Sequence, residues 1–356
     1  MNSENKNILE IDGSMGEGGG AILRLSAGFS VLFDRPIHIY NIRADRSRPG
    51  LRLQHLLGLK SLAELTSSKL SECEVGTTEV KFEPGSKRLK PKIDINIRTA
   101  ASIGLLLQPI QIACLGFNQS EKVFINLNGG GTLGKWAPGL NYLKHVTYQI
   151  FKHLGFTINL QVRKYGFYPK GGAVTTCEIF PPKNDLRSIN LTDLGNVDLI
   201  AGKIVCTTNL SNAHVAERIK SSAENRIEKE LDLKTDIRFE YVKSLSTGVG
   251  LSLWANGDTG AIISSGTVLG EKNITSEEVG KMAANKIIPY IQKNIPVDNY
   301  LSDQLLPLMA YIDTPSKMKV SEVTNHAKTN LDLIKKFIDR DYNIKKSTNF
   351  STIKLK

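Results

Sequence analysis

The segment Gly16-Glu17-Gly18-Gly19-Gly20 constrains the fold of this chain more than any other stretch. It joins a short apolar run at 8–11, typical of a strand, to a run at 21–33 that is typical of a helix. Consecutive glycines let the backbone approach a ligand closely, and free amides at a helix start favour anions. Because Glu17 would repel a phosphate unless a divalent cation lay between them, two interpretations stay open. One is a phosphate site with a metal, and the other is a tight turn with one solvated glutamate.

Strand-like and helix-like runs alternate along all 356 residues, which predicts an α/β or α+β layered fold. After the first turn, the helix-like stretches lie at 50–66, 100–115 and 138–154, and the strand-like runs at 37–42, 78–83, 92–97, 157–163 and 173–179. A second glycine turn at 128–131 and a glycine pair at 171–172 suggest a repeated unit of about a hundred residues. Their similarity is too faint to establish the repeat.

A polar, proline-containing stretch at 181–187 is the best candidate for a domain boundary. Beyond it, a self-contained alternation predicts strands at 200–207, 236–243, 249–255 and 261–268, with helices at 214–233 and 276–293. This pattern predicts a domain of about a hundred residues that is inserted into, or follows, a larger one.

The net charge of +11 favours a polyanionic partner, most commonly a nucleic acid. Arg43, Arg46, Arg48 and Arg52 lie within ten residues, and Gln54 and His55 follow them at the start of a predicted helix. The planar fork of arginine matches phosphate oxygens, so this segment could grip a polyphosphate. The alternative is a solvated basic face. The segment 317–356 is also rich in lysine, which could serve only solubility.

The sequence disfavours a membrane segment, a cysteine-based metal site and a true P-loop. No apolar run approaches the ~18 residues of a membrane span, and the N-terminus lacks a signal-peptide core, so we expect a cytoplasmic protein with no membrane partner. The four cysteines are widely spaced, which favours reduced thiols over a metal site. Gly129-x4-Gly134-Lys135 resembles a phosphate-binding P-loop, but Trp136 replaces the hydroxyl residue that would hold Mg²⁺.

His326 stands out among the six histidines by its context. It follows a strand-like run at 318–323 and precedes a predicted helix whose N-terminus lies near Thr329 or Asn330. Backbone amides at a helix start can stabilise negative charge as a nucleophile attacks phosphate. A lone histidine is nevertheless more often structural than catalytic.

Six motifs, in this order, resemble those of the RNA 3′-terminal phosphate cyclases. They are Asp12-Gly-x-x-Gly-Glu-Gly-Gly-Gly-x-Ile-Leu-Arg24, Ile42-Arg-Ala-x-Arg46 continuing to Gln54-His55, Gly166-Phe-Tyr-Pro-x-Gly-Gly172, His214-Val-Ala-Glu-Arg218, Tyr300-Leu-x-Asp-Gln-Leu305 and His326-x-x-Thr-Asn330. The match spans essentially the whole chain. It implies a large domain of repeated β/α units, each a four-stranded sheet with two helices, at 1–183 and 293–356. A smaller α/β domain at 184–292 is then inserted in the last unit.

The resemblance also implies an activity and its site. The family uses ATP to convert an RNA 3′-phosphate into a 2′,3′-cyclic phosphodiester, through AMP carried on a histidine and then on the RNA end. His326 matches that histidine, and Glu17 matches a carboxylate associated with Mg²⁺ or Mn²⁺. The remaining matches are phosphate and RNA-end groups at Arg24, Arg43, Arg46, Gln54 and His55, and nucleotide-pocket groups at Gln108, Pro138, Tyr300, Asp303 and Gln304, with Pro138 and Tyr300 enclosing the adenine.

The partners implied are ATP, an RNA with a 3′-phosphate end and, as an open question, a second copy of the chain in a homodimer. Two rivals share related folds. One is a cyclase-like factor of ribosome biogenesis or RNA processing, which lacks the catalytic histidine. The other is an enolpyruvyl transferase, disfavoured by its missing motifs. Ala21 and Ala173 depart from the family pattern, and the segment around Gln108 matches loosely, but no main catalytic position is affected.

Overall fold

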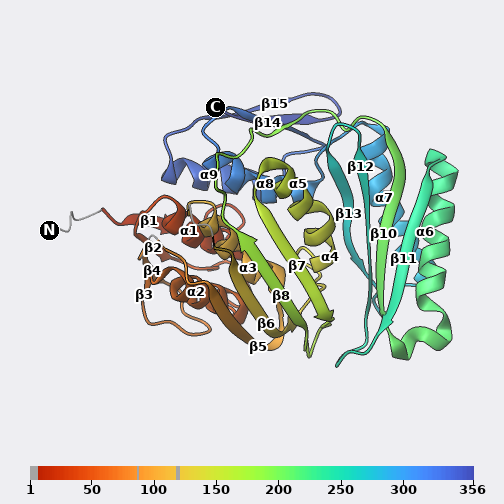
Figure 1. Cartoon of the computed structure of the whole chain (residues 1–356), viewed down its shortest axis with the longest axis horizontal. Coiled ribbons are helices and arrows are strands. Elements are labelled where there is room, and N and C mark those ends of the chain that lie inside the picture. The colour runs from red at the N-terminus through yellow and green to blue at the C-terminus, as the bar shows by residue number, and fades with distance from the viewer. Residues whose placement is uncertain (1–6, 86–87, 118–120) are drawn as a thin grey trace.

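A computed structural model of the chain describes residues 7–85, 88–117 and 121–356. In these residues the strands form four four-stranded sheets, with helices packed against them, which confirms the predicted α/β class (Figure 1). Three of the sheets share one topology. Their strands are ordered first, second, fourth, third, and only the first two are parallel.

The three units follow one another along the chain, and each has the order strand, helix, strand, helix, strand, strand. The first contains β1 (Leu9–Asp12), α1 (Gly20–Leu32), β2 (Ile37–Tyr40), α2 (Leu53–Thr66), β3 (Lys69–Leu70) and β4 (Val80–Glu83). The second contains β5 (Lys92–Ser102), α3 (Ile103–Cys114), β6 (Val123–Gly131), α4 (Leu140–Tyr142) and α5 (Tyr148–Leu154), which are joined by a π-helical turn, β7 (Thr157–Lys164) and β8 (Val174–Phe180). The third contains β9 (Asn190–Leu191), α8 (Asn299–Tyr311), β14 (Ser316–Val320), α9 (Asn325–Phe337), β15 (Tyr342–Lys346) and β16 (Ser351–Leu355).

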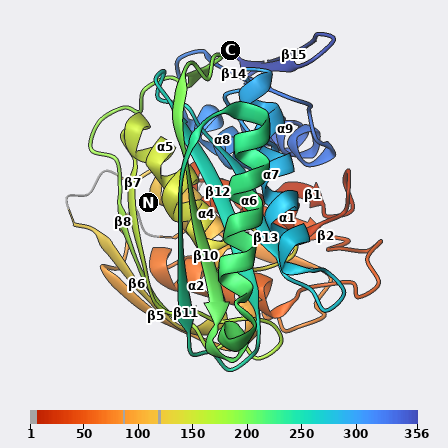
Figure 2. The ribbon, with the colours of Figure 1, turned by 90° about the vertical axis from the view of Figure 1, so that its right-hand side faces the viewer.

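The fourth sheet lies in the chain between β9 and α8, so it interrupts the third unit. Its elements are β10 (Val197–Thr207), α6 (Val215–Leu231), β11 (Lys234–Val242), β12 (Val249–Gly257), β13 (Ile262–Leu269) and α7 (Ser276–Gln292). Helices α6 and α7 lie side by side over this sheet (Figure 2) and enclose a hydrophobic cluster of its own. The domain boundaries at 184 and 292 stay a prediction. Strand β9, which follows residue 184, pairs with β14 of the third unit.

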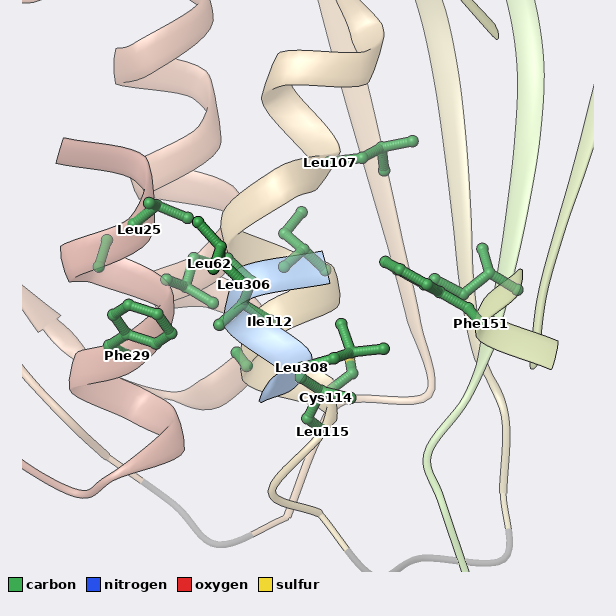
Figure 3. Packing of buried hydrophobic residues seen from close by; sticks show 14 of the residues in the cluster. Leu25, Phe29, Leu62, Leu107, Ile112, Cys114, Leu115, Phe151, Leu306 and Leu308 are labelled. Carbon is green, nitrogen blue, oxygen red and sulfur yellow. The ribbon is translucent and has the colours of Figure 1, made fainter. Parts of the chain in front are cut away.

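The three units share one hydrophobic core. Leu25 and Phe29 of α1 face Ile112 of α3, and Leu306 of α8 reaches the same cluster from the third unit (Figure 3). Helices α1 and α3 approach closely at Gly28, where a Cβ would lie 2.8 Å from that of Ile112. This packing fixes the N-termini of helices from different units relative to one another.

Two expectations about local structure need correction. The helix predicted from residue 100 begins at Ile103, because β5 continues to Ser102, whose hydroxyl caps the helix by accepting from the Leu105 amide. The glycine turn at 128–131 does not start a helix. It forms the end of β6, and the next helix begins nine residues later, at Leu140. The repeat exists, but its glycine turns do not occupy equivalent positions.

Candidate active site

The candidate site is centred on the glycine turn between β1 and α1. Gly16 and Gly18 both adopt the left-handed backbone region, with φ of +59° and +56°. A side chain on Gly16 would collide with the hydroxyl of Thr329 in α9. The turn is therefore tight because it packs directly against a helix of the third unit.

His326 lies in the first turn of α9, beside this glycine turn. The helix begins at Asn325, because the hydroxyl of Thr324 accepts a hydrogen bond of 2.9 Å from the Ala327 amide. The predicted start near Thr329 or Asn330 is therefore wrong by about one turn. His326 Nε2 lies 3.1 Å from Glu17 Oε2, and both side chains are partly exposed. The structure thus joins the predicted nucleophile to the predicted metal ligand.

The arginine segment after β2 borders the same turn. Arg46 donates a hydrogen bond of 2.8 Å to the Glu17 carbonyl and lies 4.0 Å from the Glu17 carboxylate. Arg43 has a positive φ of 56° and donates to the carbonyls of Arg48 and Gly50. Two of its five N–H groups therefore hold the loop in shape, and the others are available to a ligand. Burial, followed by the neighbouring arginines, lowers the pKa of Arg43.

A third cation, Arg24, lies behind the turn. Arg24 Nε donates a hydrogen bond of 2.7 Å to Oε1 of Gln108, a buried residue of α3. Burial lowers the pKa of Arg24 to about 10, so the guanidinium stays charged at neutral pH. Within the part of the chain that the structure describes, Arg24 forms no ion pair with a carboxylate. A desolvated cation bonded to a neutral amide is poised to receive an anion.

His55 is a neutral hydrogen-bond donor in this arrangement. Its Nδ1 accepts from the Arg52 amide, so Nε2 carries the proton, and a side chain on Gly20 would collide with that nitrogen. Burial, then the charges of Arg24, Arg43 and Arg52, lowers the pKa of His55 to about 3. The imidazole therefore stays uncharged at neutral pH and can offer its Nε2–H to a ligand at the glycine turn. The neighbouring Gln54 lies in the same first turn of α2.

The predicted nucleotide-pocket residues come from three parts of the chain. Tyr300, in the first turn of α8, is 43% exposed, and its ring lies edge-on to Tyr142 and directly against Gly266 of β13. Gly139, which follows Pro138, abuts Thr267, the next residue of β13. Tyr300 and Gly139, the residue after Pro138, therefore border two consecutive residues of the inserted sheet.

Asp303 connects this pocket to His326. It lies one turn after Tyr300 on α8 and accepts a hydrogen bond of 3.4 Å from Thr324, the capping residue of α9. Burial, then the nearby carboxylates of Glu17 and Asp298, raises the pKa of Asp303 to about 7. Gln304 follows it and is buried in α8.

Asp298 is a residue of this pocket that the sequence analysis missed. It is fully buried and accepts four hydrogen bonds, from the hydroxyl of Tyr142 and from the amides of Ser264, Tyr300 and Leu301. It thereby ties α8 to β13 and to α4. An aspartate just before a helix is a common capping residue, so its bonds to α8 could have been predicted. Its partners in other units could not.

The near-match to a P-loop has a different role. Lys135 forms an ion pair of 2.6 Å with Glu271, and Trp136 is 88% exposed. Among the described residues, no group of three or more histidine, cysteine, aspartate or glutamate side chains could hold a metal ion. An ion at Glu17 would therefore need further ligands from a bound phosphate, an arrangement that is common for Mg²⁺.

Comparison with known proteins gives one consistent match. The family model described as RNA 3′-terminal phosphate cyclase matches residues 15–344. The protein of that name from Thermococcus kodakarensis is 37% identical over 337 residues, or 94% of each chain. The protein of that name from Methanopyrus kandleri is 36% identical over 93% of each chain. The one from Archaeoglobus fulgidus is 34% identical over 94% of this chain and 96% of its own. In the described residues, every helix is too short or too polar to cross a membrane.

Proposed function

This chain belongs to the RNA 3′-terminal phosphate cyclase family, and from that premise we propose that it uses ATP to convert an RNA 3′-phosphate into a 2′,3′-cyclic phosphodiester. The observation that carries the proposal is Arg24, a charged group without an ion-pair partner in the described chain, beside the neutral donor His55 and the glycine turn. Together they offer an anion site next to the exposed imidazole of His326.

In the first step, a ring nitrogen of His326 attacks the α-phosphorus of ATP. The bond from that phosphorus to the bridging oxygen breaks, and pyrophosphate leaves with the electron pair. His326 Nε2 lies 3.1 Å from a carboxylate oxygen of Glu17, so a phosphorus that approached this nitrogen would meet that carboxylate. Attack through Nε2 therefore requires that this contact be released.

In the second step, an oxygen of the RNA 3′-phosphate attacks the same phosphorus and displaces the imidazole, which leaves AMP joined to the RNA end. In the third step, the neighbouring 2′-hydroxyl attacks the 3′-phosphorus, loses its proton and expels AMP. Ring closure is effectively intramolecular and therefore fast once the leaving group is present. Arg24, Arg43 and Arg46 would stabilise the negative charge on the transferred phosphates, and Gln54 and His55 would orient the RNA end.

The remaining predicted residues would hold the nucleotide. Pro138 and Tyr300 would enclose the adenine, while Gln108, Asp303 and Gln304 would surround its phosphate and sugar. Glu17 would bind Mg²⁺ or Mn²⁺ together with phosphate oxygens, and such an ion would neutralise charge on the phosphates. Glu17 suits this role, because it is a partly exposed carboxylate facing an anion site.

The proposal is tested with an RNA that carries a radiolabelled 3′-phosphate. After incubation with ATP and Mg²⁺, a cyclic end resists phosphatase, whereas an unconverted 3′-phosphate is removed. We expect resistance with the wild type and a loss of at least about tenfold in rate with Arg24→Lys, which keeps the charge but loses the fork. Arg35→Lys is the matched control, because Arg35 donates hydrogen bonds to backbone carbonyls at the C-terminus of α9, the end opposite to His326. An RNA end that stays sensitive would instead favour a noncatalytic cyclase-like factor.

A further inference from the structure

The open face of the third sheet carries an unusual set of charges. Strands β9, β14, β16 and β15 bury one face against α8 and α9, which lie below β14 and β15 in Figure 1. The opposite face displays four lysines and no carboxylate among its paired strand positions. We call this surface the lysine face, and its lysines are Lys317 and Lys319 of β14, Lys345 of β15 and Lys354 of β16.

The arrangement of these lysines is unfavourable for the isolated fold. Lys317 and Lys354 lie directly opposite each other on adjacent strands, where like charges repel. Within the described residues, none of the four lysines forms an ion pair. Lys319 instead places its ammonium group 5.3 Å from the ring centroid of Phe350. Hydrogen bonds, and to a smaller extent the nearby charge of Lys319, lower the pKa of the Asp193 carboxyl, just after β9. The lysine face therefore has an excess of positive charge that is only partly compensated, and one aromatic ring.

The other two units show that the topology does not require such a face. On the first sheet, the equivalent pair is His38 opposite Lys81, and His38 contacts Glu10 and Glu79. On the second sheet, Lys92 pairs with Asp94, and Lys122 pairs with Glu178. Two copies of the same architecture thus carry charges of mixed sign, whereas the third carries lysine alone.

Strand β14, which carries two of these lysines, leads along the chain to the proposed site of catalysis. Strand β14 runs towards α9, so Lys319 lies at the end of the sheet from which the chain passes to Thr324 and His326. Successive lysines on one face of a strand are about 7 Å apart, and adjacent strands are about 5 Å apart. A chain of phosphates that leaves the catalytic site across this sheet would meet several ammonium groups in succession.

We propose that the lysine face binds the body of the RNA strand whose 3′ end enters the active site. This inference rests on the proposed cyclase reaction, which supplies the RNA end at His326. Lysines attract phosphates without reading sequence, so the contact is expected to be independent of sequence and sensitive to salt. Binding to the lysine face should also make the affinity depend on RNA length, because a very short RNA would occupy the catalytic site without reaching the sheet.

The test compares Lys354→Glu with Lys81→Glu. Both lysines are exposed, and each lies on the fourth strand of its own unit. Lys354→Glu converts the repulsive pair with Lys317 into an attractive one, so the fold should not weaken. Binding is measured by fluorescence anisotropy with RNAs of about 20 and about 3 nucleotides, each with a 3′-phosphate, over a range of salt concentrations.

We expect Lys354→Glu to lower affinity for the long RNA about fivefold at about 0.1 M salt and to reduce the salt slope by about 0.7. The double variant, with Lys317→Glu and Lys354→Glu, should lower the affinity for the long RNA about 25-fold and reduce the salt slope by about 1.4. Lys81→Glu should leave both values unchanged, and the short RNA should bind all variants alike. Unchanged affinity for the long RNA, as expected if the face serves an acidic protein instead, would overturn the inference. An equal loss for both RNAs would also overturn it.

A separate readout distinguishes this inference from the cyclase proposal. Covalent labelling of each variant by α-labelled ATP, without RNA, should equal that of the wild type, because none of the substituted lysines is a residue of the proposed nucleotide pocket. If the wild type fails to label but still binds RNA through these lysines, the cyclase proposal fails and the RNA surface stands. If labelling is normal and the lysines do not matter, only the RNA surface fails.

Discussion

Substitution of Gly266 by alanine tests whether the inserted sheet shapes the nucleotide pocket. A Cβ on Gly266 would lie 2.5 Å from Cε2 of Tyr300, which is 0.9 Å short of ordinary contact at 3.4 Å. The Tyr300 ring must therefore shift, since the new methyl group belongs to a strand paired with β12. If the ring stacks on adenine, the loss of stacking is worth about 1–3 kcal/mol, or about 5- to 150-fold in the KM for ATP.

Gly260→Ala is the matched control for this substitution. Gly260 also has a positive φ, +86° against +69° at Gly266, but a Cβ added there would meet no atom of the described residues within 4 Å. Both variants should lose about 1–2 kcal/mol of stability from backbone strain. Only Gly266→Ala should raise the KM for ATP, measured from the initial rate of covalent labelling. Equal KM values in the two variants would refute the proposed contribution of β13 to the pocket.

Two further predictions concern the carboxylates of Asp303 in α8 and of Asp298, which caps that helix. The raised pKa of Asp303, about 7 against 3.8, means that the folded protein retains a proton that the unfolded chain has lost, so stability should fall as pH rises through this window. The free energy of unfolding should fall by about 2 kcal/mol less in Asp303→Asn than in the wild type between about pH 5 and about pH 8, as measured by urea denaturation. An unchanged pH dependence would contradict the raised pKa of Asp303. Asp298→Asn should cost about 2–3 kcal/mol, because its NH2 group replaces one of the two carboxylate oxygens and would face either the amide of Ser264 or those of Tyr300 and Leu301 with a donor. Thermal unfolding checks this, and a loss below about 0.5 kcal/mol would show that Asp298 is not needed to hold these elements together.

The alternation of strands and helices was predictable from the sequence, because each element carries its own apolar periodicity. The repeat was harder to see. The units share the order and pairing of their strands, whereas the glycine turns lie after the first strand in one unit and at the end of the second strand in another. Strand pairing depends on contacts between distant residues, which periodicity does not reveal.

In the site, too, features set by neighbouring residues were more predictable than contacts between distant parts of the chain. The Thr324 cap could have been predicted from the sequence, because threonine is a preferred capping residue, but the predicted helix start near Thr329 or Asn330 missed it. The contact between Glu17 and His326 spans the first and third units and depends on how α1 and α9 pack. The lysine face could be recognised only once the register of three strands was known, because shifting one strand by a single residue would turn its lysines to the opposite face.

The most direct test of the proposed chemistry is covalent labelling by α-labelled ATP with Mg²⁺ or Mn²⁺, followed by denaturing electrophoresis. We predict a label on the wild type that is labile in acid and stable in alkali, as a phosphoramidate on histidine would be. The label should be absent from His326→Ala and retained by His153→Ala, which removes an exposed histidine of α5. Full labelling of His326→Ala, or no labelling of the wild type with either metal, would contradict the account.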